Sequence, residues 1–130
     1  MNHQQEIEII LARQLASYLA VPIFLVDPQG TLLFYNEPAE VILGQRFEET
    51  GAMPIDEWSM VFEPTDEAGK PLAEDQLPLV IALAQREATH KDFWIVGLDD
   101  ERRHIEVTSI PLVGQADRHV GALAVFWEVR

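Results

Sequence analysis

The last third of the chain carries the feature that most limits the fold. Three runs rich in strand-forming residues, 92–98, 102–112 and 120–129, follow one another with only short polar segments between them. Connections of that length are typical of β-hairpins, and strands joined by hairpins pair antiparallel. Helical patterns are confined to the first two thirds of the chain. Strands and helices grouped in this way favour an α+β fold with an antiparallel sheet.

The strand runs also indicate how that sheet is packed. Residues 93–96 and 123–127 are almost entirely apolar, without the alternation of apolar and polar side chains that a half-exposed strand shows. The sequence therefore predicts that both faces of the sheet are covered. We expect central helices on one face, and either the N-terminal helix or a partner subunit on the other.

A second hairpin is predicted near the start. The apolar run Ile23–Val26 and the run 31–35 flank Asp27-Pro-Gln-Gly30, in which Asp opens a turn, Pro fixes φ and Gly closes it. Asn36 is a plausible N-cap for a short helix that ends at Gly44. Residues 45–74 are the least regular. After them, Asp75 is the predicted cap of a further helix.

The first 20 residues predict an amphipathic helix over 4–20, stopped by Pro22. We divide the chain into this helix, 1–21, and a domain, 22–130. The stripe either forms a homodimer interface or docks on the chain's own sheet. Its proposed interface residues are Ile7, Leu11, Leu15, Tyr18 and Leu19.

Composition removes several classes of function. Nine basic residues oppose 22 acidic ones, for a formal net charge of -13. Such a chain repels the phosphates of nucleic acids and anionic membrane surfaces. It has no apolar run long enough to cross a membrane and no signal-peptide pattern, which favours a cytoplasmic location. With no cysteine, disulfides, thiolate metal sites and cysteine nucleophiles are excluded.

The order of these elements resembles the PAS sensor family of bacterial signalling proteins over nearly the whole chain. The resemblance rests on Asp27-Pro-Gln-Gly30 with Leu32-Leu-Phe-Tyr-Asn36, and on Gly69-Lys-Pro-Leu72 with Asp75-Gln-Leu-Pro-Leu79. Residues 105–111 and 120–126 are similar to the last two strands of the family. Where many members continue into Asp-Ile-Thr, this chain reads Glu128-Val-Arg130. Ending there favours a piece cut from a longer sensor over a stand-alone module.

The resemblance implies a five-stranded antiparallel sheet with central helices on one face and a cavity between them. A fully packed core is the alternative. The candidate wall residues are Phe24, Val26, Ile42, Leu43, Trp58, Phe62, Leu79, Leu83, Phe93, Ile95, Ile105, Val107, Ser109, Leu123 and Val125. Ser109, Thr108 and Asn36 are the polar candidates, so we expect a small and mostly apolar ligand.

The cofactor is left open. A cysteinyl flavin adduct and a thioester-linked chromophore are excluded because cysteine is absent. Among the histidines, His90 lies where some relatives hold haem, but a surface histidine is the favoured interpretation. Noncovalent flavin stacked on Trp58, Trp94 or Trp127 stays open. No spacing of ligand residues indicates a metal site.

The resemblance implies a sensory module that binds a small ligand or a partner and relays the event to an output domain such as a histidine kinase. A ligand-free homodimerisation module with a packed core is the alternative. An enzyme is not expected, since no nucleophile or phosphate-loop motif is present. Asp92 and Glu106 are the strand-borne acids, and both are expected to face solvent.

Overall fold

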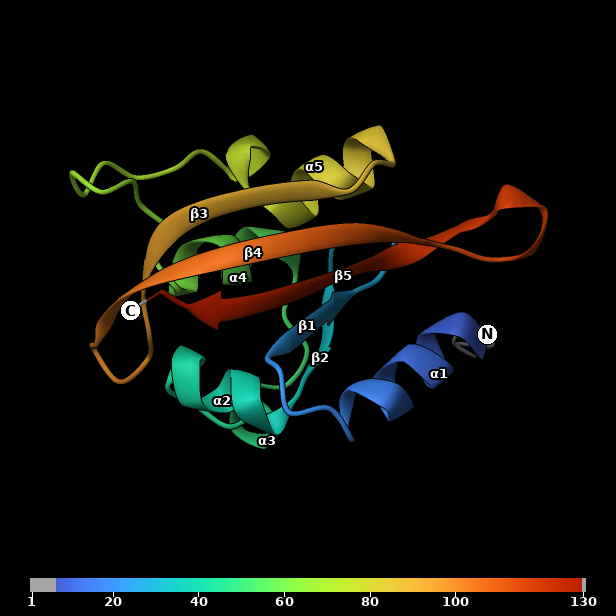
Figure 1. Ribbon diagram of the computed structural model, residues 1–130, viewed down its shortest axis with the longest axis horizontal. Helices are drawn as coiled ribbons and strands as arrows, with labels where there is room; N and C mark the ends of the chain where they lie inside the picture. The colour runs from blue at the N-terminus through green and yellow to red at the C-terminus, as the bar shows by residue number, and fades with distance from the viewer. Residues whose placement is uncertain (1–6, 130) are drawn as a thin grey trace.

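The computed structural model describes residues 7–129, which form one five-stranded antiparallel sheet in the order β2-β1-β5-β4-β3 (Figure 1). The strands are β1 (Ile23–Val26), β2 (Leu32–Tyr35), β3 (Thr89–Val96), β4 (Arg102–Val113) and β5 (His119–Glu128). The helices are α1 (Ile7–Ala16), α2 (Glu37–Leu43), α3 (Phe47–Thr50), α4 (Ile55–Val61) and α5 (Pro78–Gln85), with 3₁₀ turns η1 (Glu74–Gln76) and η2 (Gln115–Asp117). The predicted fold class and antiparallel sheet are confirmed.

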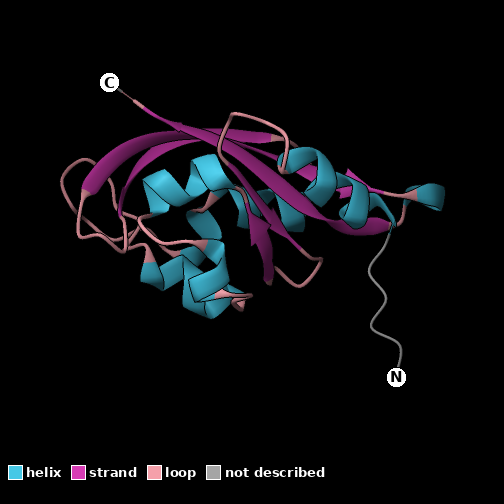
Figure 2. Cartoon of the chain, turned by 90° about the horizontal axis from the view of Figure 1, so that it is seen from below, coloured by secondary structure: helices cyan, strands magenta, loops and turns pink. Residues whose placement is uncertain are grey.

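The sheet has two distinct faces because side chains on a strand alternate in direction. Figure 2 shows helices gathered on one side of the curved sheet, which we call the inner face. They are α2, α3, α4 and α5, whose apolar residues pack in the core against the sheet. A large apolar core fills the space between them and contains Phe24, Ile105, Val107 and Phe126. The opposite, outer face carries a smaller cluster in which Ile9 of α1 packs with Leu25, Val120 and their neighbours.

Asn36 joins the first hairpin to the helices on both sides of it. Its Oδ1 accepts hydrogen bonds from the backbone N–H of Ile23 (2.9 Å) and Ala39 (3.3 Å), so it is the predicted N-cap of α2. Its Nδ2 donates to the backbone carbonyls of Ala16 and Val21, at 2.9 Å each. All of its bonding capacity is used inside the fold, and it does not face a ligand site.

Helix α1 lies on the outer face of the sheet, apart from the other helices (Figure 1). Within the described residues it ends at Ala16, earlier than predicted, and the predicted residues 4–6 fall outside the described range. Ile9 and Ala16 are its buried residues, with Ala12 packed beside them. The helix therefore docks on the chain's own sheet, but through Ile9, Ala12 and Ala16 and not through the stripe, which faces outward.

Two local predictions in the middle of the chain need correction. The segment read as irregular contains α3 and α4, whose short helical stretches are too brief to show a period. Asp75 does not cap α5. It lies within η1, and Leu77 is the residue before the first turn of α5. Proline at the first position of α5 needs no cap for its missing N–H.

Candidate functional site

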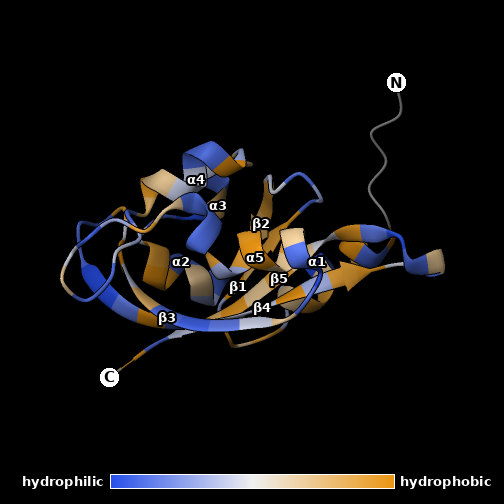
Figure 3. Ribbon diagram, turned by 90° about the horizontal axis from the view of Figure 1, so that it is seen from above, coloured by the Kyte–Doolittle hydropathy of each residue, from blue (hydrophilic) through white to orange (hydrophobic). Residues whose placement is uncertain are grey.

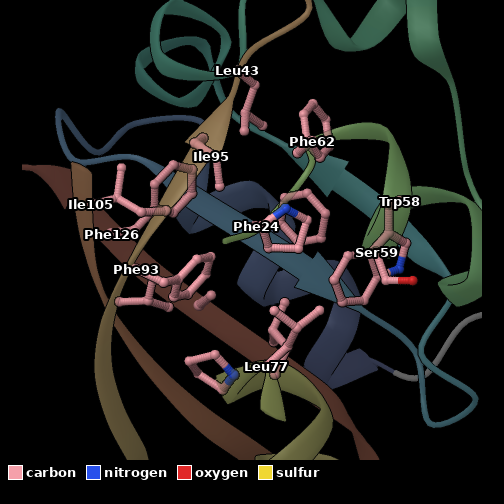
Figure 4. A pocket seen from close by; sticks show the side chains of 15 residues that line it. Phe24, Leu43, Trp58, Ser59, Phe62, Leu77, Phe93, Ile95, Ile105 and Phe126 are labelled. Atoms are coloured by element: carbon pink, nitrogen blue, oxygen red, sulfur yellow. The ribbon is translucent and has the colours of Figure 1, made fainter. Parts of the chain in front are cut away.

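A cavity of about 80 Å³ lies between the inner face of the sheet and the helices. Figure 4 shows side chains from the strands and from the helical segments pointing toward one another around it. Its wall is built from Phe24, Leu43, Trp58, Ser59, Phe62, Pro64, Leu77, Pro78, Leu79, Phe93, Ile95, Ile105, Val107, Ala124 and Phe126. Apart from Ser59 and the indole N–H of Trp58, the side chains of this wall are hydrocarbon.

The two polar groups of the wall already have partners. The Nε1–H of Trp58 donates to the backbone carbonyl of Gly30 at 2.7 Å. The hydroxyl of Ser59 lies 3.3 Å from Oε1 of Glu74. A ligand in the cavity would therefore find no free hydrogen-bonding side chain in the wall. A space of this kind excludes charged and strongly polar molecules, whose lost hydration nothing would replace.

Edge-to-face aromatic contacts support one side of the wall. The rings of Phe24 and Trp58 lie 5.3 Å apart at 66°, and Phe24 stacks at 6.1 Å on Tyr35. The hydroxyl of Tyr35 donates to the backbone carbonyl of Gln45 at 2.8 Å, and burial raises the pKa of this phenol. This aromatic wall is anchored by hydrogen bonds from its polar tips, which fixes the ring positions.

The structure brings most of the expected wall residues together around this cavity. Those in the wall are Phe24, Leu43, Trp58, Phe62, Leu79, Phe93, Ile95, Ile105 and Val107. Val26 and Ile42 are buried in the surrounding core without reaching the cavity. Leu83 is partly buried and packs against that core. Ser109 is fully buried on the same face, and its hydroxyl has no hydrogen-bond partner.

Leu123 and Val125 were expected in the wall, and the structure places them on the outer face. Their neighbours Ala124 and Phe126 line the cavity instead. Leu123 packs beside the cluster of Ile9 and Leu25. Both faces of β5 are apolar, so its sequence gives no signal for which set of alternate residues points inward. The register with β1, Phe24 opposite Ala124, is what fixes the direction.

The part of the wall opposite the sheet also contains residues that the sequence analysis does not predict there. Leu77, Pro78 and Pro64 belong to loops or to the first residue of α5. Loop residues have no periodicity that assigns them to a face. The dipeptides Glu63-Pro64 and Leu77-Pro78 indicate turns, but they do not indicate whether their side chains are buried.

The candidate haem ligand His90 lies on the outer face of β3, and it does not reach the cavity. Its Nδ1 is 2.8 Å from the hydroxyl of Thr108, and its Nε2 is 3.8 Å from Oε2 of Glu106. Asp92 is also on this face, 2.8 Å from Nε2 of His104. The hydrogen bond from His104 lowers the pKa of Asp92, the opposite of what a buried general acid needs.

The outer face near β3 is polar and aromatic. Trp94 stacks on His104 with 4.6 Å between ring centroids, and the guanidinium of Arg102 lies 4.1 Å from the centre of the Trp94 ring. Figure 3 shows β3 as largely hydrophilic, in contrast to the hydrophobic α5. Trp94 and Trp127 thus lie on the face opposite the cavity and cannot stack on a ring bound inside it.

Within residues 7–129, no group of three or more His, Asp or Glu side chains is placed to hold a metal ion. No helix in that range is long and apolar enough to cross a bilayer.

The sequence matches the family model described as PAS fold over residues 10–129, which is nearly all of the chain that forms the sheet, its helices and the cavity. The chain belongs to the PAS fold family. The resemblance inferred from its turns and strand order is thereby confirmed. A search of curated proteins found no match.

Solved PAS structures share this architecture at low sequence identity. The PAS domain of a Colwellia psychrerythraea protein is 19% identical, with a TM-score of 0.65 over 92% of this chain and 97% of that one. The Rhodobacter sphaeroides LOV protein is 17% identical, with a TM-score of 0.75 over 96% and 69%. The PAS domain of Bordetella pertussis BvgS is 18% identical, with a TM-score of 0.68 over 96% and 88%. At these identities, the similarity establishes the fold.

The cavity of this PAS domain does not fit the large cofactors considered from the sequence. Flavin and haem carry polar and charged groups for which the wall offers no free partner.

Proposed function

We propose that this domain is a cytoplasmic sensory module in which a small, uncharged, apolar molecule enters the cavity and biases the domain between two states. The change is relayed to an output domain such as a histidine kinase. The single observation that carries the proposal is the space of about 80 Å³ walled by hydrocarbon, with both polar groups of its wall already bonded. Membership of the PAS family supports the signalling role.

The size of the cavity limits the ligand. An apolar cavity of about 150 Å³ engineered into another protein stays free of water and holds benzene or xenon. The space here is about half as large, so we expect an occupant no larger than a small ring, admitted by a modest widening of the wall. Binding would come from contacts with the ring faces of Phe24 and Phe93 and the methyl groups of leucine and isoleucine.

A pair of probes with the same ring size tests the ligand class. Cyclopentane is uncharged and apolar, whereas pyrrolidine is a cation at pH 7. We expect cyclopentane at saturation to raise the melting temperature of the domain, because it binds the folded state. Pyrrolidine is expected to leave the melting temperature unchanged.

Two substitutions at neighbouring positions of β5 localise that effect. Ala124→Val adds carbon atoms to the cavity wall, and Val125→Ile adds one on the outer face. We expect Val125→Ile to keep the response to cyclopentane and Ala124→Val to lose it. An equal response in both variants, or no response in the native domain, would overturn the ligand proposal. The urea midpoint of each variant reports whether it is folded.

A specific observation favours a second function, homodimerisation. The stripe proposed from the sequence faces outward: Leu15 is 60% exposed and Tyr18 is 82% exposed. Ile7, Ile10 and Leu11 are also exposed on the same helix. Exposed apolar side chains gathered in this way mark an interaction surface. We propose that a second copy of the chain covers them, because a two-fold axis lets one apolar stripe cover its own copy. Light scattering at micromolar concentration that gives only the monomer mass would contradict this.

A further inference from the structure

Arg103 of β4 connects three separate parts of the domain. Its Nη1 donates to the backbone carbonyl of Ile42 at 2.8 Å, at the end of α2. Its Nη1 and Nη2 also donate to the two carboxylate oxygens of Asp99 in the β3–β4 turn, at 3.1 and 2.8 Å. Its Nε lies 4.0 Å from Oε1 of Glu128, the last residue of β5.

One of the parts held by Arg103 is a wall of the cavity. Leu43, the residue after Ile42, lines the cavity, and its carbonyl accepts a hydrogen bond from the N–H of Leu98 at 2.8 Å. Ile95, directly opposite Arg103 in the sheet, and Ile105 line the cavity as well. A shift of the end of α2 therefore moves the cavity residue Leu43 together with the Ile42 carbonyl, to which Arg103 donates a hydrogen bond.

The contact between α2 and the β3–β4 turn is close. Gly44 has a φ of +79° at the C-cap of α2, and a Cβ there would lie 2.6 Å from the backbone nitrogen of Asp99. Only glycine allows this approach. The bidentate pair of Arg103 with Asp99 is strong, and the Arg103 side chain is largely buried. The hydrogen bonds between them lower the pKa of Asp99 and raise the pKa of Arg103.

The other end of the connection lies where β5 finishes. Glu128 is the Cα partner of Ile105, and the backbone N–H of Val129 donates to the carbonyl of His104 at 2.8 Å. Residues 127–129 therefore follow directly after Phe126 of the cavity wall, and Glu128 is the residue among them that contacts Arg103.

We infer that Arg103 is the positioning residue that couples the end of α2 beside the cavity to the end of β5. An occupant in contact with Leu43 changes the position of the Ile42 carbonyl, and Arg103 adjusts its contact with Glu128. The inference rests on the proposed function, since it needs an occupant of the cavity. A planar guanidinium suits this task because its fixed fork holds a carbonyl and a carboxylate at once.

Xenon is the probe for the experiment, because it is apolar and fits small dry cavities. Methyl groups of Leu43, Ile95 and Ile105 report occupancy of the cavity by NMR. Backbone amides of Glu128 and Val129 report the end of β5, and methyl groups of Ile9 and Leu25 in the outer cluster serve as reference. In the native domain, we expect xenon to shift both the cavity methyl signals and the two amides, and to leave the reference methyl signals in place.

Arg103→Met tests the connection. It keeps the length of the side chain and removes all four contacts described above. We expect the cavity methyl signals still to respond to xenon and the response of the Glu128 and Val129 amides to be lost. Arg102→Met is the matched control. Arg102 lies one residue away on β4 and stacks on Trp94 of the outer face, so both responses should remain in this variant.

Asp99→Asn is a second variant in case Arg103→Met does not fold. It leaves Arg103 in place and weakens the bidentate pair, so the amide response should fall while the cavity methyl response stays. If the amides respond fully in both Arg103→Met and Asp99→Asn, or never respond in the native domain while the cavity methyl signals do, the role of Arg103 is overturned. If the cavity methyl signals do not respond in the native domain, the proposed function fails first, and this inference falls with it.

Discussion

Around the cavity, the residues of β3, β4 and β5 that point toward the helices are apolar, whereas the residues between them, which point the other way, are mixed. Phe93, Ile105 and Phe126 belong to the first group. Asp92 and His104 belong to the second and form a pair with each other. The same strands therefore carry two surfaces of different chemistry, separated only by the alternation of side chains.

The difference shows what each face is suited to do. The inner face leaves a cavity lined by hydrocarbon, in which both polar groups of the wall already have partners. The outer face is divided. Helix α1 covers its apolar part near Leu25 and Leu123, and the part on β3 and β4 carries exposed polar pairs such as Asp92 with His104. The proposed recognition of a small molecule belongs to the first face, and the proposed contact with a second copy of the chain belongs to the second.

The largest expected difference between the faces comes from their tryptophans. Trp58 in the cavity wall is 6% exposed, and Trp127 on the outer face is 41% exposed. Trp58→Ala is expected to lower the free energy of unfolding by about 3–5 kcal/mol, because it removes a buried ring and its hydrogen bond. Trp127→Ala should cost clearly less. Urea unfolding of both variants measures this, and equal losses would break the distinction between the two faces.

A smaller contrast is expected on α1, between its docked side and its exposed stripe. Ile9→Ala should lower the free energy of unfolding by about 2 kcal/mol, because Ile9 is buried in the outer cluster. Leu15→Glu is expected to change the stability of a single chain by less than about 0.5 kcal/mol, as surface substitutions do.

The same Leu15→Glu variant should dissociate the proposed dimer, since it places a charge in the centre of the apolar stripe. Analytical ultracentrifugation of the native chain, Leu15→Glu and Ile9→Ala separates the two effects. A Leu15→Glu protein with unchanged mass in solution would show that the stripe is not the interface.

The smallest expected effect is a pH dependence at His119, the first residue of β5. Burial lowers the pKa of His119 below its ordinary value of 6.5, and the charge of Arg86 adds to this. The unfolded chain therefore takes up a proton below pH 6.5 that the folded chain resists, and stability falls as the pH drops through this value. In His119→Leu, this part of the pH dependence should disappear. The free energy of unfolding of both proteins is measured between pH 7.5 and 5.5. An equal decrease in the two proteins would contradict the assignment.

Much of the fold is predictable from the sequence because turn chemistry is local. Asp27-Pro-Gln-Gly30 forms a turn in which the N–H of Gly30 donates to the carbonyl of Asp27 at 2.9 Å. Asn36 and Gly44 mark the two ends of α2 as expected. The three late strands are predicted from their composition. Strand β3 begins earlier than predicted, at Thr89. Its first half contains charged residues such as Lys91 and Asp92, which are not typical of a strand.

The candidate site is less predictable, because it depends on which way the strands and helices face. On β5, the apolar residues of both faces look alike, so Leu123 and Val125 could not be told from Ala124 and Phe126. On α1, the most conspicuous apolar stripe is the exposed one, and the helix docks through Ile9 and Ala16. A hydrophobic pattern alone does not say which side of a strand or helix packs against the rest of the chain.

The central claim is that the inner face encloses a dry apolar space that accepts a small molecule. Crystals of the domain placed under xenon pressure test it most directly. The account predicts a xenon atom bound among Phe24, Leu43 and Phe93, with no ordered water there in untreated crystals. An ordered, hydrogen-bonded water in this space, or side chains that fill it and exclude xenon, would contradict the account.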